Sequence, residues 1–249
     1  GILIGVAVVL WGILASGLWD DLAVMREYQG RQSAFFAQLQ VHLFLAFGSV
    51  AAAVLIGVPV GIVCYRIPRV RAGILGSLNV VQTVPSIALF GLLIAPMAWI
   101  GANVPGAREL GIGGIGYAPA FLALFAYSLL PIVSNTVVGL DGVPRDANEA
   151  ARGMGMTNGQ RMTGVLLPLA FPVILTGIRI ILVQNIGLAV IAGLIGGGGL
   201  GTFVFQGISQ TAMPLVLLGA IPAVAMAFAA AIVLDAGVEL SQGRQRARP

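Results

Sequence analysis

Very few side chains in this sequence could carry out acid–base, nucleophilic or metal chemistry. The 249 residues contain one histidine, His42, one cysteine, Cys64, and no lysine. One thiol can form no internal disulfide and no cysteine-based metal site. Without a lysine, none of the glycine clusters can be a Walker A loop, whose lysine reaches the nucleotide phosphates. We therefore expect no catalytic residue, no metal site and no conventional ATPase in this chain.

Eight polar side chains lie within long apolar stretches and are the groups that could contact a solute. They are Gln82, Thr83, Ser86, Tyr127, Ser134, Asn135, Gln184 and Asn185. A polar group in hydrocarbon is costly unless it is paired, so these groups should face the bundle interior, a subunit contact or a water-filled path. Pro85 frees the Val81 carbonyl four residues back, which neighbouring side chains could satisfy. A kinked helix with mutually paired groups and the lining of a translocation path both remain open.

Two further ionisable groups lie in apolar stretches. His42 has no acidic partner in the apolar runs, so hydrogen bonding at the headgroup level is favoured over a proton relay. Arg179 lies about three helical turns after Pro168. Since no carboxylate lies in the middle of any apolar run, we expect Arg179 to bind backbone carbonyls or a partner subunit.

The elements that position these residues are predicted by composition and by hydrophobic runs. The chain is 58% hydrophobic and 9% charged, whereas a soluble domain is about a quarter charged. Crossing a bilayer takes roughly 20 apolar residues. We expect an all-α integral membrane protein with about six transmembrane helices, over residues 2–19, 40–64, 74–96, 117–138, 167–193 and 213–238.

The arginines orient this bundle. Nine of them fall on one side of the predicted membrane: Arg66, Arg69, Arg71, Arg145, Arg152, Arg161, Arg244, Arg246 and Arg248. By the positive-inside rule that side is cytoplasmic, which places both termini inside. The basic balance then reflects topology and contact with anionic lipid headgroups, and nucleic-acid binding is not expected. We divide the chain into a first helix with an extracytoplasmic connection (1–39), a transmembrane domain (40–238) and a basic cytoplasmic tail (239–249).

One polar segment, the loop over residues 141–166, has a helical pattern of its own. Asp146 could cap a short helix, on which Ala147, Ala150, Ala151 and Met154 share an apolar face. Gly153 and Gly155 should end it, and Thr157 with Gln160 forms a capping-box pattern for a second helix. Pro168 fits the first turn of the apolar run that follows. A helix lying on the bundle or membrane and a docking helix for another protein are the main alternatives, and a catalytic loop lacks support.

This loop resembles the EAA loop of permease subunits of bacterial ATP-binding-cassette importers. The matching residues are Glu149-Ala150-Ala151, Gly155, Val165 in place of the usual isoleucine, and Leu167-Pro168. From His42 to Ala231 the chain further resembles permeases of osmoprotectant uptake systems for glycine betaine, choline and carnitine. The segments that carry this likeness are His42-Leu43, residues 57–61, 79–86, 127–132 and 149–157, and the glycine-rich stretch 195–201, which also resembles methionine importers.

The resemblance implies a type I importer permease that works by alternating access. Glu149, Ala150, Ala151, Gly153, Gly155, Leu167 and Pro168 would then couple it to a separate ATPase, which binds ATP and magnesium. A second permease copy or a sibling permease, and a periplasmic or lipid-anchored binding protein, complete the expected assembly. The outer turn with Gly197, Gly198 and Gly199 is a candidate gate, and the ring of Tyr127 suits a quaternary ammonium.

Other functions are compatible with the same residues. The permease could carry another small solute such as an amino acid. An ATP-independent secondary transporter would need an ion-coupling site, and the apolar runs contain no obvious acidic residue for one. A purely structural membrane subunit predicts that Gln82, Tyr127 and Asn185 can become alanine without altering transport.

Overall fold

The computed structural model describes residues 23–246, with side chains described up to residue 240. The expected span over residues 2–19 therefore lies outside the described residues, as do the tail side chains. Within the described range all regular elements are helices. In chain order they are α2 (Ala23–Gly30), α3 (Gln32–Leu43), η1 (Phe44–Gly48), α4 (Ser49–Arg66), α5 (Pro68–Thr83), α6 (Ser86–Asn103), α7 (Tyr117–Asp141), α8 (Arg145–Gly153), α9 (Asn158–Arg161), η2 (Met162–Leu166), α10 (Leu167–Ile191), η3 (Ala192–Ile195), α11 (Gly201–Ser209) and α12 (Met213–Arg246).

Five helical stretches between residues 23 and 246 are long and apolar enough to cross a membrane. They are Gln32–Arg66, Ser86–Asn103, Tyr117–Asp141, Asn158–Ile195 and Met213–Leu240. The apolar runs at 40–64, 117–138, 167–193 and 213–238 each fall within one of these helices, which confirms four of the predicted spans. Within residues 23–246 the chain is thus a multi-pass helical bundle.

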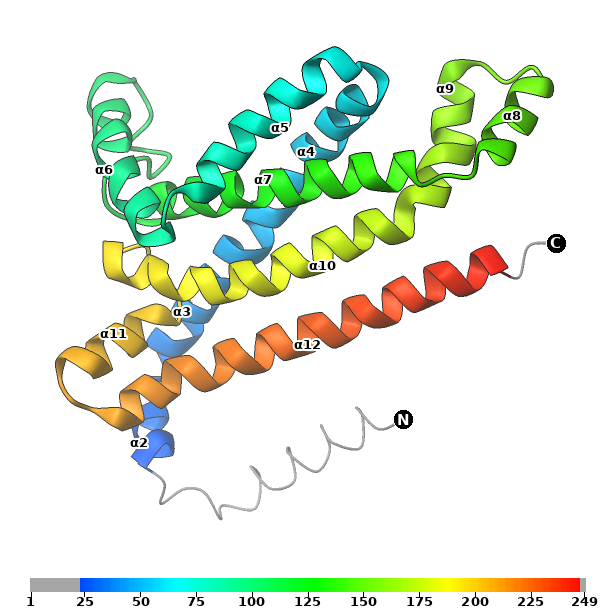
Figure 1. The fold of residues 1–249 in the computed structure, drawn as a ribbon. Helices are drawn as coiled ribbons and strands as arrows, with labels where there is room; N and C mark the ends of the chain where they lie inside the picture. The colour runs from blue at the N-terminus through cyan, green and yellow to red at the C-terminus, as the bar shows by residue number, and fades with distance from the viewer. Residues whose placement is uncertain (1–22, 247–249) are drawn as a thin grey trace.

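The prediction of one kinked helix over residues 74–96 is wrong. The chain breaks completely there into α5 and α6, which run in different directions (Figure 1). Val84 and Pro85 are extended, with ψ angles of 127° and 137°. Because the proline ring disfavours a helical conformation for the residue before it, Val84 leaves the helix as well. The candidate span is therefore Ser86–Asn103.

Helix α7 is the centre of the bundle and packs against α4 on one side and α10 on the other. Glycines on α4 make the first contact close. A Cβ atom at Gly57 would lie 2.9 Å from Cγ2 of Ile132, and one at Gly61 would lie 2.6 Å from Cβ of Thr136. Close backbone approach through small residues is a common way for membrane helices to associate.

One helical stretch of 38 residues, Asn158–Ile195, joins two distant parts of the molecule. It starts beside α8, passes through α9, η2 and α10, and ends in η3 next to the glycine-rich turn (Figure 1). The π-helical turn η2 ends two residues before Pro168, and it is a local widening of the kind that accommodates a missing amide donor. Helix α12 runs alongside α10.

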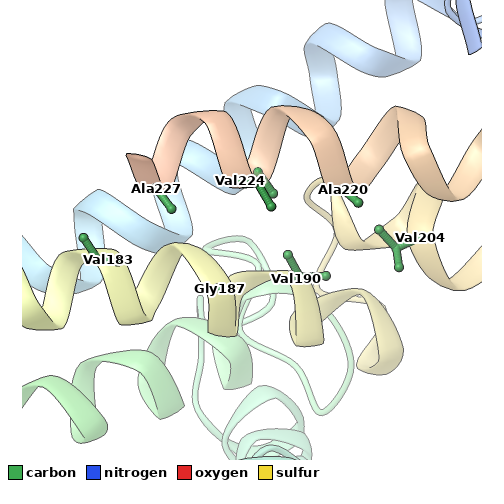
Figure 2. A pocket seen from close by; sticks show the side chains of 8 residues that line it. Val183, Gly187, Val190, Val204, Ala220, Val224 and Ala227 are labelled. Atoms are coloured by element: carbon green, nitrogen blue, oxygen red, sulfur yellow. The ribbon is translucent and has the colours of Figure 1, made fainter. Parts of the chain in front are cut away.

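An apolar pocket of about 210 Å³ lies between α10, α11 and α12. Figure 2 shows its lining, which comes from Val183, Gly187, Val190, Val204, Ala220, Ala223, Val224 and Ala227. None of these side chains carries a polar atom. The pocket therefore offers no hydrogen-bonding group to a polar solute and is separate from the predicted path residues.

Candidate solute path and coupling loop

The loop helix α8 is exposed on most of its surface. Its first turn contains Asp146, but no side chain caps it, so the predicted cap by Asp146 is wrong. The N-cap is Pro144, whose extended conformation starts the helix two residues earlier than the sequence pattern indicates. Asp146 instead lies in the first turn of α8, where the helix dipole favours a negative charge.

The predicted apolar face of this helix is divided between the bundle and solvent. Ala151 is buried and faces the protein, Ala147 is partly buried, and Ala150 and Glu149 are exposed. Met154, directly after the helix, is 74% exposed. The exposed Met154 and Ala150 side chains form a small apolar surface on the loop. Methionine is flexible, so this surface can adapt to the shape of a partner.

The turn after α8 depends on one of the two predicted glycines. Gly155 has a φ angle of 77°, in the left-handed region that glycine adopts without a steric penalty. Gly153 is the last residue of α8 and is not in that conformation. The capping box of α9 is confirmed: the Gln160 N–H donates to Thr157 Oγ1 at 3.3 Å, and the Thr157 N–H donates to Gln160 Oε1 at 2.8 Å.

Two hydrogen bonds join the helix break at Val84 to the centre of α7. Nε2 of Gln82 donates to the Tyr127 carbonyl at 2.9 Å, and the Tyr127 hydroxyl donates to the Val84 carbonyl. The freed carbonyl of Val81 accepts from the Val84 N–H at 3.3 Å, so a backbone amide rather than a side chain supplies the predicted donor. Thr83, on the exposed side, donates to Val80.

Asn185 is fully buried in a second polar cluster. Its Nδ2 donates to Oγ of Ser49 at 2.9 Å and to Oγ of Ser128 at 2.8 Å, which links α10, α4 and α7. The Ser49 hydroxyl in turn donates to a backbone carbonyl in η1 and the Ser128 hydroxyl to one in α7, whereas Asn185 Oδ1 is buried without a partner. Ser49 was not predicted, since a serine in an apolar run gives no sign of where its partner lies.

The remaining predicted path residues do not join either cluster. Nδ2 of Asn135 donates to the Pro131 carbonyl of its own helix. Ser86 and Ser134 are partly buried, and Gln184 is exposed. The structure thus brings Gln82 together with Tyr127 at the helix break, and places Asn185 in a separate buried cluster.

Arg179 has an acidic partner that the sequence analysis missed. Nη2 of Arg179 lies 2.7 Å from Oδ2 of Asp235 on α12, and both side chains are partly exposed. Asp235 lies within the candidate span Met213–Leu240, so the expectation of carbonyl or partner-subunit contacts for Arg179 overlooked this carboxylate. A signal was available, because an arginine and an aspartate in two consecutive spans are natural partners.

The glycine-rich turn packs against α3. The N–H of Gly199 donates to Oε1 of Gln38 at 2.6 Å, and the Thr202 hydroxyl donates to the same oxygen at 3.4 Å. His42, one helical turn after Gln38, is fully buried under Gly199. The predicted hydrogen bonding of His42 at the headgroup level is therefore wrong, because the turn covers its ring.

The described part of the chain is thus a multi-pass helical bundle with an exposed loop helix at one end of its longest candidate span and a glycine turn at the other. The chain belongs to the family of binding-protein-dependent transport system inner membrane components, whose family model matches residues 34–247. Members of this family are transport components and not enzymes. Among the described residues, no group of three or more His, Cys, Asp or Glu side chains could hold a metal ion.

Characterised relatives cover most of the chain. It is 44% identical to the osmoprotectant import permease protein OsmW of Salmonella typhimurium over 194 residues, 78% of this chain and 83% of that protein. It is 37% identical to the carnitine transport permease protein OpuCB of Listeria monocytogenes, covering 82% and 87%. The choline transport system permease protein OpuBB of Bacillus subtilis is 37% identical, covering 78% and 80%.

A solved structure shares the fold. An inward-facing form of the MetNI methionine ABC transporter matches with a TM-score of 0.73 and 22% identity, covering 84% of this chain and 97% of that one. At that identity the likeness establishes the type I permease fold.

Proposed function

We propose that this protein is the permease subunit of an ATP-driven importer of osmoprotectants such as glycine betaine, choline, carnitine or similar quaternary ammonium solutes. The observation that carries the proposal is that relatives 37–44% identical over about four fifths of the chain bear those names. The partners would be ATPase subunits, which hold ATP and magnesium, a second copy or sibling permease, and a binding protein. Both termini and the loop helix would face the cytoplasm, where ATP is available.

The loop helix α8 is the proposed docking element for the ATPase. Its exposed side carries Glu149, Ala150 and Met154, while Ala151 anchors it to the permease. An exposed apolar methionine in a water-facing loop supports a protein partner, since such a side chain gains by burial. Movement of α8 would pass directly into α10, because the helical stretch Asn158–Ile195 begins just after the Gly155 turn.

The solute path would run along the helix break, where Gln82 and Tyr127 bridge α5 and α7. The two-bond bridge supports a hinge role for these residues, because opening the path between α5 and α7 would break both bonds. Ser86, Ser134, Asn135 and Gln184 are partly buried or exposed and remain candidates for the lining. Asn185 serves this path as a fixed support for α4, α7 and α10.

The test is uptake by the complete complex in vesicles. The permease would be purified with its ATPase, reconstituted with its binding protein, and supplied with labelled betaine, choline, carnitine or methionine. We expect ATP-dependent uptake of at least one quaternary ammonium solute. Uptake of methionine alone would favour the amino-acid alternative, and uptake without ATP would favour a secondary transporter. Wild-type uptake by Gln82→Ala and Tyr127→Ala variants would support a purely structural role for these residues.

A further inference from the structure

The glycine turn Gly196–Gly199 is built to change shape. Gly196, Gly198 and Gly199 all have φ angles between 69° and 82°, a region that other residues rarely adopt. Glycine takes either hand of backbone conformation at little cost, so the turn can rearrange without steric strain. It also follows directly on the long helical stretch that begins at the loop helix.

One side chain holds the turn in its described position. Gln38 on α3 accepts the Gly199 N–H at 2.6 Å and the Thr202 hydroxyl at 3.4 Å through one oxygen. Its approach is close, since a Cβ atom at Gly198 would lie 3.1 Å from that oxygen. Gln38 therefore fixes both the end of the turn and the start of α11.

His42 lies one helical turn further along the same face of α3, and it is not satisfied. The side chain is fully buried, and neither Nδ1 nor Nε2 has a hydrogen-bond partner. The ring also lies beside the backbone of Ile186. A Cβ atom at Gly199 would lie 3.2 Å from Nδ1, so the ring borders the turn directly.

A buried polar group without a partner is rare and calls for a physical explanation. Gly199 already lies against the His42 ring while its N–H donates to Gln38. A small rotation of the turn that breaks this bond would redirect the Gly199 N–H from Oε1 of Gln38 to Nδ1 of His42. His42 would then gain the partner that it lacks here.

We propose that Gln38 and His42 are alternate holding points for the glycine turn, with Gln38 engaged in the described state and His42 in a second state. Both are positioning residues, because they act through the turn rather than on the solute. This inference rests on the proposed role of Gly197, Gly198 and Gly199 as the outer gate, and it names the side chains that set the two gate positions.

A cysteine beneath the turn can report its position. The reporter is Val41→Cys in a Cys64→Ser background, since a Cβ atom at Gly198 would lie 3.1 Å from Cγ1 of Val41. The measurement is the maleimide labelling rate of the purified permease–ATPase complex, with and without Mg-ATP. Phe36→Cys, on the same helix and 53% exposed, is the control and should be labelled at one rate throughout.

The variants separate the two holding points. Without nucleotide, Gln38→Leu should raise the labelling rate of the reporter about three- to tenfold, the range expected for one net hydrogen bond. Gln38→Glu keeps an acceptor oxygen and should leave the rate unchanged, and Thr202→Val should change it less than Gln38→Leu does. His42→Leu should leave the rate without nucleotide unchanged but abolish its response to Mg-ATP, which His42→Gln should restore.

Two results would overturn the inference. If the Gln38→Leu variant and the parent reporter protein are labelled at the same rate, Gln38 does not hold the turn. A normal nucleotide response of His42→Leu would show that the histidine only fills space. If the parent reporter itself does not respond to Mg-ATP, the gate assignment fails as well, so the two failures are distinguishable.

Discussion

Asn185 contributes to the protein through the amide of one side chain. It donates to hydroxyls on two other helices, so three elements meet at one fully buried nitrogen. Asn185→Leu removes both bonds from the buried cluster. We expect this variant to lose about 1–3 kcal/mol of unfolding free energy, measured by denaturant titration in detergent.

The neighbouring residue Gln184 is the matched control for that measurement, because its side chain is exposed. Gln184→Leu should change the unfolding free energy by no more than about 0.5 kcal/mol. Equal losses for the two variants would mean that the buried cluster contributes nothing specific.

Residue types alone predicted some of these contacts and could not predict others. Gln82, Tyr127 and Asn185 lie in apolar runs, where an unpaired polar group is costly, so the sequence predicts that each has a hydrogen-bond partner. Their partners were not, because Ser49 is 136 positions from Asn185. The sequence offers Asp235 as a partner for Arg179, but only the helix register decides that these two charges in different spans meet.

At the scale of the helices, glycine has opposite effects at two positions. A Cβ atom at Gly61 would collide with Thr136 at 2.6 Å, whereas nothing lies within 4 Å of one at Gly73. Gly61→Ala should cost about 1–3 kcal/mol by overpacking the contact between α4 and α7. Gly73→Ala, in the open middle of α5, should gain about 0.5–1 kcal/mol from helix propensity. Thermal unfolding of the two variants in parallel checks the predicted difference in sign.

The ion pair between α10 and α12 makes a separate prediction for helix packing. Because Arg179 and Asp235 are 35% and 45% exposed, solvent screening limits their coupling to about 1 kcal/mol or less. A double-mutant cycle with Arg179→Ala and Asp235→Ala should measure that value. Additive effects of the two substitutions would mean that the contact does not hold α10 on α12.

Helix boundaries were predicted well where one physical signal acts alone. Four apolar runs fall within candidate spans because crossing the hydrocarbon core takes roughly 20 apolar residues. The run at 74–96 failed because two signals compete there: its apolar composition favours a span, and Pro85 acts on Val84 as well as on its own position. The start of α8 was misplaced for a similar reason, since Pro144 begins the helix before Asp146.

At the scale of the whole molecule, the turn after α8 decides how the loop helix meets an ATPase. Gly155→Ala should be strained by about 1–2 kcal/mol, because φ is 77° there and no neighbouring atom offers another explanation. We expect this variant to hydrolyse ATP with severalfold less solute uptake per ATP. Gly153→Ala, in ordinary helical conformation with equal space around it, is the control.

The coupling ratio, uptake divided by ATP hydrolysed, is the decisive quantity in reconstituted vesicles. Glu149→Arg, at an exposed position of α8, should lower it as well while leaving membrane insertion intact. A normal ratio in both Gly155→Ala and Glu149→Arg would remove α8 from the transmission route.

The uninterrupted helical stretch Asn158–Ile195 also fixes an angular relation between its two ends. Each residue of an α-helix adds about 1.5 Å and a rotation of about 100°. Inserting one residue in the middle of α10 would therefore turn the loop helix by more than a quarter of a revolution relative to the glycine turn. An insertion in the connection 104–116 would leave that azimuth unaltered. We therefore expect insertions and deletions to be tolerated in the connection 104–116 and not in α10.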